Sequence, residues 1–295
     1  TDHFQIEVVL QRQNGIDGHL AKELLLVGGP CAIEDNQQMH KVAQVLKNSP
    51  VNAIRGGLFK PRTSPYSFQG LGADGLGIVE QTKNISGMPF ISEIMSKEHI
   101  DIAIDHIDVM QIGSRNMQNF ELLKEVGRTN KPVLLKRGLS ATLEEMILAA
   151  EYIMAEGNEK VILCERGIRS YDPSTRNVLD LGAVAVLKQM THLPVIVDPS
   201  HAAGRADIIP DLARAAIACG ADGLIIEAHP EPEKSVSDAK QALSLEELAE
   251  LMRSLDGIAR AVGRKIPDMN TGYFLRLQRY DPSLQLVDMR LLLHR

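Results

Sequence analysis

The sequence has no tryptophan, only 4% aromatic residues, and three cysteines among 295 residues. So few aromatic side chains argue against a nucleic-acid surface that depends on base stacking. Three cysteines, with no secretory signal at the start, predict a reducing cytoplasm and no disulfide framework. No apolar run approaches the roughly 20 residues that a membrane span needs. We therefore expect a cytoplasmic protein that binds neither nucleic acid nor a membrane.

Positive charge is also in deficit, because 38 acidic residues outweigh 32 basic ones and give a formal net charge of -6. The protein as a whole therefore does not attract polyanions, and any phosphate binding must come from local clusters of Arg and Lys. The hydrophobic fraction of 44% is typical of a soluble domain. The length suffices for one α/β barrel, which uses about 250 residues.

Short apolar runs alternate with amphipathic stretches along the chain. The predicted strands are 24–27, 53–55, 89–92, 109–112, 132–136, 161–164, 194–197 and 223–226. The predicted helices are 37–47, 72–83, 97–105, 120–127, 143–155, 181–190, 208–219 and 245–261. Eight such pairs are typical of an α/β (β/α)8 TIM barrel. An open doubly wound sheet is the competitor, but no GxGxxG motif follows the first strand.

The two ends of the chain fall outside this alternation. Residues 1–20 alternate in part and contain Asn14-Gly15, a turn signal, so we expect a short N-terminal hairpin extension. Residues 21–268 are the predicted catalytic barrel. Residues 269–295 form a C-terminal tail of unknown role.

Seven cations follow the predicted strands at or just after their carboxyl ends, where a barrel places its active site. They are Arg55, Lys60, Arg62, Arg115, Lys136, Arg137 and Arg166. Thr63 and Ser64 add hydroxyl donors. A single Arg or Lys is usually a solvated surface charge. So many on one rim would repel one another unless anions fill the mouth, so they predict a phosphate-binding rim.

A second set of strand-end residues suits a metal. Cys31, His201 and Glu227, with an Asp further on, offer a thiolate, an imidazole and a carboxylate, which favours Mn, Fe, Co or Zn. Taken alone, Cys31 would fit a small buried apolar side chain and His201 a structural histidine. Glu227 ends an apolar run, where an unpaired carboxylate is costly. Only barrel closure would bring these residues together.

Six motifs make the sequence resemble the DAHP synthases of the type I beta class, from about residue 24 to about residue 261. The motifs are Gly28-Gly29-Pro30-Cys31, Lys60-Pro61-Arg62-Thr63-Ser64, Lys136-Arg137-Gly138, Glu165-Arg166-Gly167-Ile168-Arg169, Asp198-Pro199-Ser200-His201 and Glu227-Ala228-His229-Pro230. The resemblance implies condensation of phosphoenolpyruvate with erythrose 4-phosphate and water, which yields 3-deoxy-arabino-heptulosonate 7-phosphate and phosphate. This reaction is the first step of the shikimate pathway.

The resemblance also implies roles for individual residues. The metal ligands would be Cys31, His201, Glu227 and Asp238. Phosphoenolpyruvate would be held by Arg115, Lys136 and Arg166, with Arg55, Glu93 and Ser114 beside it. The aldose phosphate would be bound by Lys60, Pro61, Arg62, Thr63 and Ser64. Lys136, Cys31 and His201 would be the catalytic residues.

The chain departs from the family pattern at two places. Ser114 stands where the family usually has Ala, and Ser237-Asp238-Ala239-Lys240 replaces a Ser-Asp-Gly sequence. We expect no N-terminal regulatory domain, so regulation would need the C-terminal tail or a partner such as a separate chorismate mutase. We also expect a homo-oligomer, a dimer or a tetramer.

Three other functions are compatible with these residues. A sister enzyme makes 3-deoxy-manno-octulosonate 8-phosphate from arabinose 5-phosphate, but its aldose loop reads Lys-Ala-Asn-Arg-Ser-Ser. A Schiff-base aldolase could use Lys136, which would leave the metal set unexplained. A barrel that binds sugar phosphates without turnover is the third.

Overall fold

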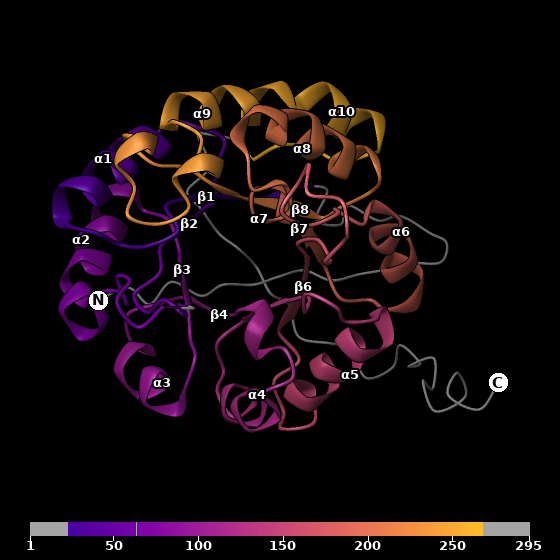
Figure 1. Cartoon of the computed structure of the whole chain (residues 1–295), viewed down its shortest axis with the longest axis horizontal. Coiled ribbons are helices and arrows are strands. Elements are labelled where there is room, and N and C mark those ends of the chain that lie inside the picture. The colour runs from indigo at the N-terminus through magenta and orange to yellow at the C-terminus, as the bar shows by residue number, and fades with distance from the viewer. Residues whose placement is uncertain (1–22, 63, 268–295) are drawn as a thin grey trace.

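The computed structural model describes residues 23–62 and 64–267 of the chain. Eight parallel strands, in sequence order, close into a barrel that helices surround (Figure 1). The strands are β1 (Leu25–Gly29), β2 (Ala53–Arg55), β3 (Phe90–Glu93), β4 (Val109–Ile112), β5 (Val133–Lys136), β6 (Val161–Glu165), β7 (Val195–Val197) and β8 (Gly223–Glu227). β8 pairs with β1 from Leu25↔Gly223 to Gly29↔Glu227. This pairing confirms the predicted (β/α)8 barrel and excludes the open sheet.

The predicted helices all occur, with small differences at their ends. The helices of the described residues are α1 (Asn36–Leu46), α2 (Leu76–Ser86), α3 (Lys97–Ala103), α4 (Phe120–Gly127), α5 (Leu143–Met154), α6 (Leu181–Met190), α7 (Pro199–Ala203), α8 (Ile209–Ala218), α9 (Leu245–Ser254) and α10 (Asp256–Ala261). The stretch predicted as 245–261 is two helices that meet at Leu255. None of these helices is both long and apolar enough to cross a bilayer.

Local sequence signals explain several helix ends. Thr142 caps α5, because its hydroxyl accepts from the N–H of Glu145 at 3.1 Å and the Glu145 carboxylate accepts from the N–H of Thr142 at 2.8 Å. Such a capping box stabilises a helix by about 1 kcal/mol. Gly220, at φ 96°, follows the end of α8. The start of α5 and the end of α8 therefore lie where the sequence signals predict them.

Side chains alternate along each strand between the barrel interior and the surrounding helices, and this alternation determines which residues lie at the bottom of the active site. An apolar cluster of inward-facing residues comprises Val27, Ala53, Ile91, Val109, Leu134, Ile162, Cys164, Ile196 and Ile225. Successive inward-facing residues of a strand are two positions apart. The positions two residues beyond members of this cluster include Arg55, Glu93, Gln111, Lys136, Asp198 and Glu227. A polar layer therefore lies directly above the apolar barrel interior, at the carboxyl ends of the strands.

Parts of the predicted organisation lie outside the described residues. These are the predicted N-terminal hairpin at 1–20, the C-terminal tail at 269–295, and Thr63. The elements from Leu25 to Ala261 fall within the predicted barrel range of 21–268.

Candidate active site

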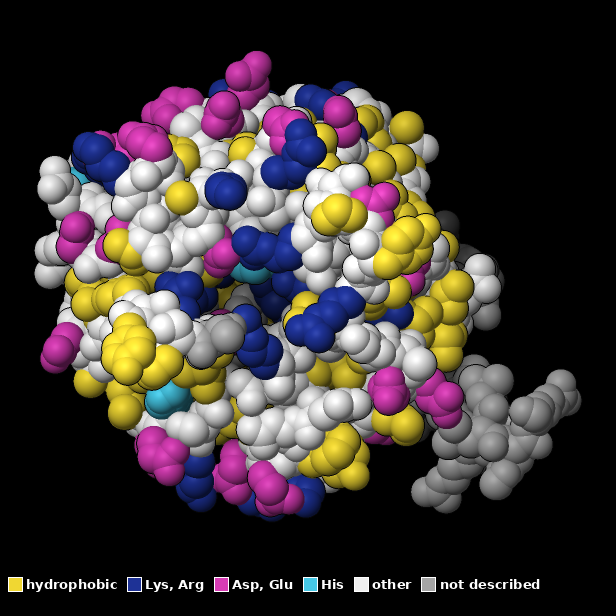
Figure 2. Space-filling model, viewed as in Figure 1, with side chains coloured by type: hydrophobic (Ala, Val, Ile, Leu, Met, Phe, Trp, Pro, Cys, Tyr) yellow, Lys and Arg dark blue, Asp and Glu magenta, His cyan; other side chains and the backbone are white. Residues whose placement is uncertain are grey.

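A polar cavity opens at the carboxyl ends of the strands, where Figure 2 shows a hollow ringed by Lys and Arg side chains. Its volume of about 550 Å³ is in the range of small-ligand sites. The predicted residues that line it are Cys31, Arg55, Lys60, Pro61, Arg62, Ser64, Glu93, Ser114, Arg115, Lys136, Arg166, His201 and Asp238. Residues that were not predicted also line it, namely Ser67, Gln111, Gly113, Leu139, Arg169, Arg176 and Asn177.

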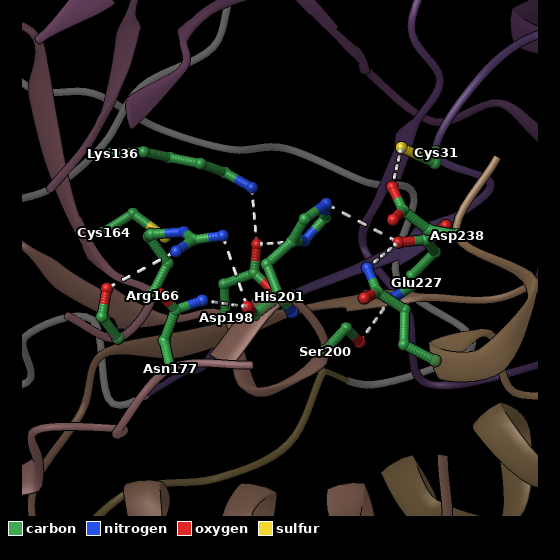
Figure 3. Close-up of polar contacts among 12 residues, drawn as sticks. Cys31, Lys136, Cys164, Arg166, Asn177, Asp198, Ser200, His201, Glu227 and Asp238 are labelled. Atoms are coloured by element: carbon green, nitrogen blue, oxygen red, sulfur yellow. Dashed lines mark hydrogen bonds and ion pairs between the residues drawn. The ribbon is translucent and has the colours of Figure 1, made fainter. Parts of the chain in front are cut away.

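Four side chains that could hold a metal ion converge at one side of this cavity (Figure 3). Donor atoms of Cys31, His201, Glu227 and Asp238 all lie within 4.8 Å of one another. The Cys31 thiol is 3.4 Å from Asp238 Oδ2, and His201 Nε2 is 3.6 Å from Glu227 Oε2. The four residues span 207 positions in the sequence, so barrel closure brings them together as predicted.

His201 is presented by α7, a short helix that follows β7 directly. Asp198 caps this helix, because its Oδ1 accepts from the N–H of His201 at 3.0 Å. Pro199 occupies the first helical position, and Gly204 ends the helix at φ 69°. This helix was not predicted from the sequence, although an Asp-Pro start and a Gly stop are recognisable helix signals.

Two glycines leave room for functional side chains at the strand ends. A Cβ atom on Gly29, at φ 136°, would lie 2.3 Å from the carbonyl oxygen of Arg55. A Cβ atom on Gly113 would lie 2.0 Å from Glu93 Oε1. Any side chain at either position would therefore displace the layer that carries Arg55 and Glu93.

The donor set fits a divalent transition metal. Glu227 Oε1 is buried without a hydrogen-bond partner, which is costly unless a cation or another group binds this oxygen. Its second oxygen accepts from Gln241 Nε2 at 2.6 Å, and its backbone N–H donates to Ser200 Oγ at 2.9 Å. One thiol, one imidazole and two carboxyls form a mixed soft and hard set of the kind that Mn, Fe, Co and Zn accept. Gln241, which orients Glu227, was not predicted.

Burial controls the protonation of these donors. Burial lowers the pKa of His201 to about 3, so its imidazole is neutral, as a metal ligand must be. Burial raises the pKa of Glu227 to about 7, and burial and the charge of Glu227 raise the pKa of the Cys31 thiol. Burial opposes ionisation of Asp238, but the charge of Arg176 and a hydrogen bond from the Cys31 thiol hold the pKa of its carboxyl well below the usual range. A metal must therefore displace protons from Glu227 and Cys31.

Metal affinity is expected to rise with pH between about pH 6 and pH 8. Below a pKa of about 7 the Glu227 carboxyl holds a proton that competes with the metal. The Cys31 proton competes over the whole interval, because burial raises the pKa of this thiol above its usual value. Each displaced proton contributes up to about a tenfold change in affinity per pH unit. Competition of Mn²⁺ between the protein and a chelating dye at several pH values measures this slope, and an affinity independent of pH would contradict the assignment.

Lys60 links the metal cluster to the cation-rich rim. Its Nζ lies 3.0 Å from both the sulfur and the carbonyl oxygen of Cys31, and 3.8 Å from Glu93 Oε2. Burial works to lower the pKa of Lys60, but Cys31 and Glu93 outweigh it and the pKa is raised. A charged Lys60 therefore favours the thiolate form of Cys31.

Two guanidinium groups in the cavity have donors with no partner. Arg55 Nη1 and Arg62 Nη2 are buried and make no hydrogen bond. Buried donors without partners are rare, and a guanidinium suits the oxygens of phosphate or carboxylate. These two atoms are therefore available to anionic ligands.

The loop between β8 and α9 connects Arg62 to the metal cluster. Arg62 Nη1 donates to Ser237 Oγ at 2.9 Å, and Ser237 precedes the metal-site residue Asp238. The loop is held from the other side by Glu34, whose carboxylate accepts from the N–H of Val236 at 3.0 Å. The predicted aldose-binding loop and one predicted metal ligand thus share a support that was not predicted.

The prediction for Arg137 is wrong. The Arg137 guanidinium turns away from the cavity. It pairs with Glu165 at 2.8 Å and with Asp180 at 3.1 Å, and it donates to the carbonyl oxygen of Ala141. Arg137 follows inward-facing Lys136 by one residue, so its side chain points away from the barrel axis. Its role is to join β5 to the loop before α6.

Two exposed arginines of the loop between β6 and α6 extend the ring of cations. Arg169 and Arg176 line the cavity, and Arg176 Nη2 lies 3.0 Å from Asp238 Oδ1. Neither was given a role from the sequence, because neither lies at the end of a strand, although Arg169 belongs to one of the family motifs. They increase the positive potential around an already cationic mouth.

Comparisons with known proteins agree with this geometry. The model of the DAHP synthetase I family matches residues 7–262. A phospho-2-dehydro-3-deoxyheptonate aldolase of Thermotoga maritima is 48% identical over 241 residues, which cover 82% of this chain and 71% of the relative. A 2-dehydro-3-deoxyphosphooctonate aldolase of Acidithiobacillus ferrooxidans is 31% identical over 266 residues, which cover 84% of this chain and 94% of the relative.

Solved structures show the same relationship. The crystal structure of the Thermotoga maritima DAHP synthase superposes with a TM-score of 0.81 at 44% identity, over 88% of this chain and 76% of that one. A truncated form of 3-deoxy-D-arabino-heptulosonate 7-phosphate synthase from the same organism superposes with a TM-score of 0.78 at 40% identity, over 88% of this chain and 95% of that one. With the barrel, the metal-binding cluster and these matches in agreement, the resemblance is confirmed, and the chain belongs to the DAHP synthetase I family.

Proposed function

We propose that this chain condenses phosphoenolpyruvate with erythrose 4-phosphate and water to give 3-deoxy-arabino-heptulosonate 7-phosphate and inorganic phosphate. The observation that carries the proposal is the meeting of a four-donor metal cluster and a ring of cations in one cavity. Family membership supports it, as does the name of the 48% identical relative. The product would enter aromatic amino acid biosynthesis.

Cys31, His201, Glu227 and Asp238 would hold a divalent metal, which we expect to be Mn, Fe, Co or Zn. When bound, such a metal supplies Lewis acidity, which can polarise an aldehyde oxygen or acidify a water molecule. The buried, partnerless Glu227 Oε1 supports this assignment. Lys60, beside the Cys31 sulfur, would keep that ligand ionised.

Arg115, Lys136 and Arg166 would bind phosphoenolpyruvate, with Arg55 and Glu93 beside it. In the reaction, C3 of phosphoenolpyruvate bonds to the aldehyde carbon, and the aldehyde oxygen takes up one proton of the water. The water oxygen adds to C2 and becomes the keto oxygen, and phosphate leaves with the electrons of the C2–O bond and the second proton. Cations around the phosphate stabilise the charge that grows on it. Lys136 would bind electrostatically first, and it is also a candidate proton donor or relay.

Lys60, Pro61, Arg62, Thr63 and Ser64 would bind the aldose phosphate, with Arg62 and Thr63 at its phosphate group. The free Arg62 Nη2 supports this role for Arg62, while Thr63 and its role rest on the resemblance alone. Ser114 lines the same cavity beside the phosphoenolpyruvate residues. Holding both substrates in one cavity converts a bimolecular reaction into an effectively unimolecular one.

Three further predictions concern the protein in the cell. We expect a homo-oligomer, dimer or tetramer, in the cytoplasm, with regulation supplied by a partner such as a separate chorismate mutase. Light scattering of the purified chain, alone and with a chorismate mutase, tests the assembly. A monomer that ignores the added protein would contradict both expectations about assembly.

Phosphate release by the purified protein tests the proposed function. The protein is stripped with a chelator, restored with Mn²⁺, and assayed with phosphoenolpyruvate and either erythrose 4-phosphate or arabinose 5-phosphate. We expect no turnover without metal, and faster turnover with erythrose 4-phosphate after Mn²⁺ is restored. Faster turnover with arabinose 5-phosphate would instead support the activity named for the 31% identical relative.

Two further outcomes would each indicate a different function. Binding of both substrates without phosphate release would indicate a sugar-phosphate-binding barrel. A covalent adduct trapped on Lys136 with pyruvate and borohydride would indicate a Schiff-base aldolase. Either outcome would contradict the proposed condensation.

A further inference from the structure

One carboxylate oxygen lies between the lysine proposed to bind phosphoenolpyruvate and the histidine proposed to bind metal (Figure 3). Asp198 Oδ2 is 2.5 Å from Lys136 Nζ and 2.8 Å from His201 Nδ1. The other oxygen, Oδ1, accepts from the backbone N–H of His201 at 3.0 Å. Asp198 has no exposed surface, so water does not screen these contacts.

The two ring nitrogens of His201 face different partners. Nε2 points to the metal cluster, 3.6 Å from Glu227 Oε2, while Nδ1 faces Asp198. A carboxylate only accepts protons, so it favours the neutral tautomer with hydrogen on Nδ1. Nδ1 and Oδ2 lie 2.8 Å apart without forming a hydrogen bond in this structure, but the charge of the carboxylate still favours that tautomer. The Nε2 lone pair is then free to bind a metal.

Lys136 contacts the same Oδ2. Its Nζ is buried at the cavity wall, where an ammonium group needs a counter-charge. Asp198 supplies that charge until an anionic ligand arrives. A phosphate that draws Lys136 toward itself would leave Oδ2 with more negative charge to offer His201.

We propose that Asp198 is a positioning residue that makes metal binding and phosphoenolpyruvate binding depend on each other. The proposal rests on the proposed function for the roles of Lys136 and His201. A cation on Nε2 makes the Nδ1 hydrogen more acidic and strengthens its contact with Asp198, which releases Lys136 for phosphate. Phosphate on Lys136 acts in the same direction, so each ligand raises the affinity of the other by the same factor.

Two substitutions separate this role from a structural one. In Asp198→Asn the single oxygen can keep the cap on the N–H of His201, which leaves the NH₂ group facing Nδ1 and Lys136. An NH₂ group donates, so it favours the tautomer with hydrogen on Nε2, the metal-binding nitrogen. Asp198→Ala imposes no tautomer. We therefore expect the wild type to bind metal most tightly, Asp198→Ala less tightly and Asp198→Asn least tightly. A purely structural role predicts instead that Asp198→Asn binds metal more tightly than Asp198→Ala, because Asn keeps the cap.

The readout is Mn²⁺ affinity, measured by competition with a chelating dye without and with phosphoenolpyruvate. We expect Asp198→Asn to lower it by about 10- to 100-fold and to reduce the factor by which phosphoenolpyruvate raises it. Thermal unfolding of the metal-free proteins should rank Asn above Ala, the reverse of the order for metal affinity. Asp180→Asn is a matched control, since Asp180 caps α6 at 2.9 Å and pairs with Arg137 at 3.1 Å. Its metal affinity should equal that of wild type.

Wild-type Mn²⁺ affinity in Asp198→Asn, or an unchanged effect of phosphoenolpyruvate on it, would overturn the proposal. So would tighter Mn²⁺ binding by Asn than by Ala. If the Ala variant does not fold, the comparison of Asn with wild type decides. None of these measurements needs turnover. Failure of the proposed function would appear separately, as a lack of phosphate release by the wild-type protein with both substrates and Mn²⁺.

Discussion

Replacing Cys31 with alanine is expected to lower metal-dependent phosphate release by at least about 1000-fold, since a catalytic metal contributes several kcal/mol to the barrier. The change removes the thiolate from the donor cluster and leaves three nitrogen and oxygen donors. It also removes the sulfur beside Lys60 Nζ. The fold should survive, because Cys31 lines the cavity and is not part of the main hydrophobic core. Turnover, bound metal after dialysis and a thermal unfolding curve measure these effects together.

Cys219→Ala is the matched control for this experiment. Cys219 is a half-buried thiol at the end of α8 that donates to the carbonyl oxygen of Leu181. Its removal should change neither turnover nor metal content. His201→Ala should behave like Cys31→Ala, because it removes another member of the cluster. Turnover near the wild-type level in either variant would contradict the metal site.

Replacing Arg115 with alanine is expected to lower kcat/KM for phosphoenolpyruvate by about 100-fold, the effect of losing a hydrogen bond between charged groups worth about 2.7 kcal/mol. Arg115 is exposed at the cavity mouth and donates one hydrogen bond, to the carbonyl oxygen of Pro61 at 3.2 Å. The free energy of unfolding should therefore stay within about 0.5 kcal/mol of the wild-type value. Steady-state kinetics with each substrate varied in turn, and thermal unfolding, measure both effects.

Arg214→Ala provides the corresponding control. Arg214 is a partly exposed arginine on α8 that pairs with Asp211 at 3.1 Å, and it does not line the cavity. Its loss removes the same charge and should leave the kinetics unchanged. If both variants lost activity equally, net charge would explain the effect, and Arg115 would have no specific role in binding phosphoenolpyruvate.

The barrel could be predicted from the sequence because each strand is a short apolar run between polar turns. Strand 109–112 was predicted to the residue, as β4. β1 was predicted to end at Val27, directly before Gly28 and Gly29. It continues through Gly29 because pairing with β8 holds it extended. The division of the last predicted helix at Leu255 also depends on tertiary packing, which periodicity does not show.

Cys31, His201 and Glu227 could be predicted as a metal site because each lies at or near a strand end, and barrel closure brings them together. Asp238 lies in the long loop after β8 and was predicted from the family resemblance. The alternation of inward- and outward-facing side chains along the strands would have predicted two further features of the site. Asp198 is two residues beyond inward-facing Ile196, so it belongs to the polar layer, and Arg137 is one residue out of phase with that layer.

Other functional residues carry no such signal. Ser237 and Arg176 are placed by the conformations of long loops, and Gln241 acts through Glu227. Loop conformation depends on contacts made far away in the sequence, which no local pattern encodes.

An anomalous difference map from crystals soaked with Mn²⁺ would locate the metal without any assay of turnover. We expect one strong peak bounded by the side chains of Cys31, His201, Glu227 and Asp238. The same crystals with phosphoenolpyruvate should show its phosphate among the cations of the cavity. A Mn²⁺ peak elsewhere, or none in a crystal whose cavity is open to solvent, would contradict the metal site and the catalytic assignment that depends on it.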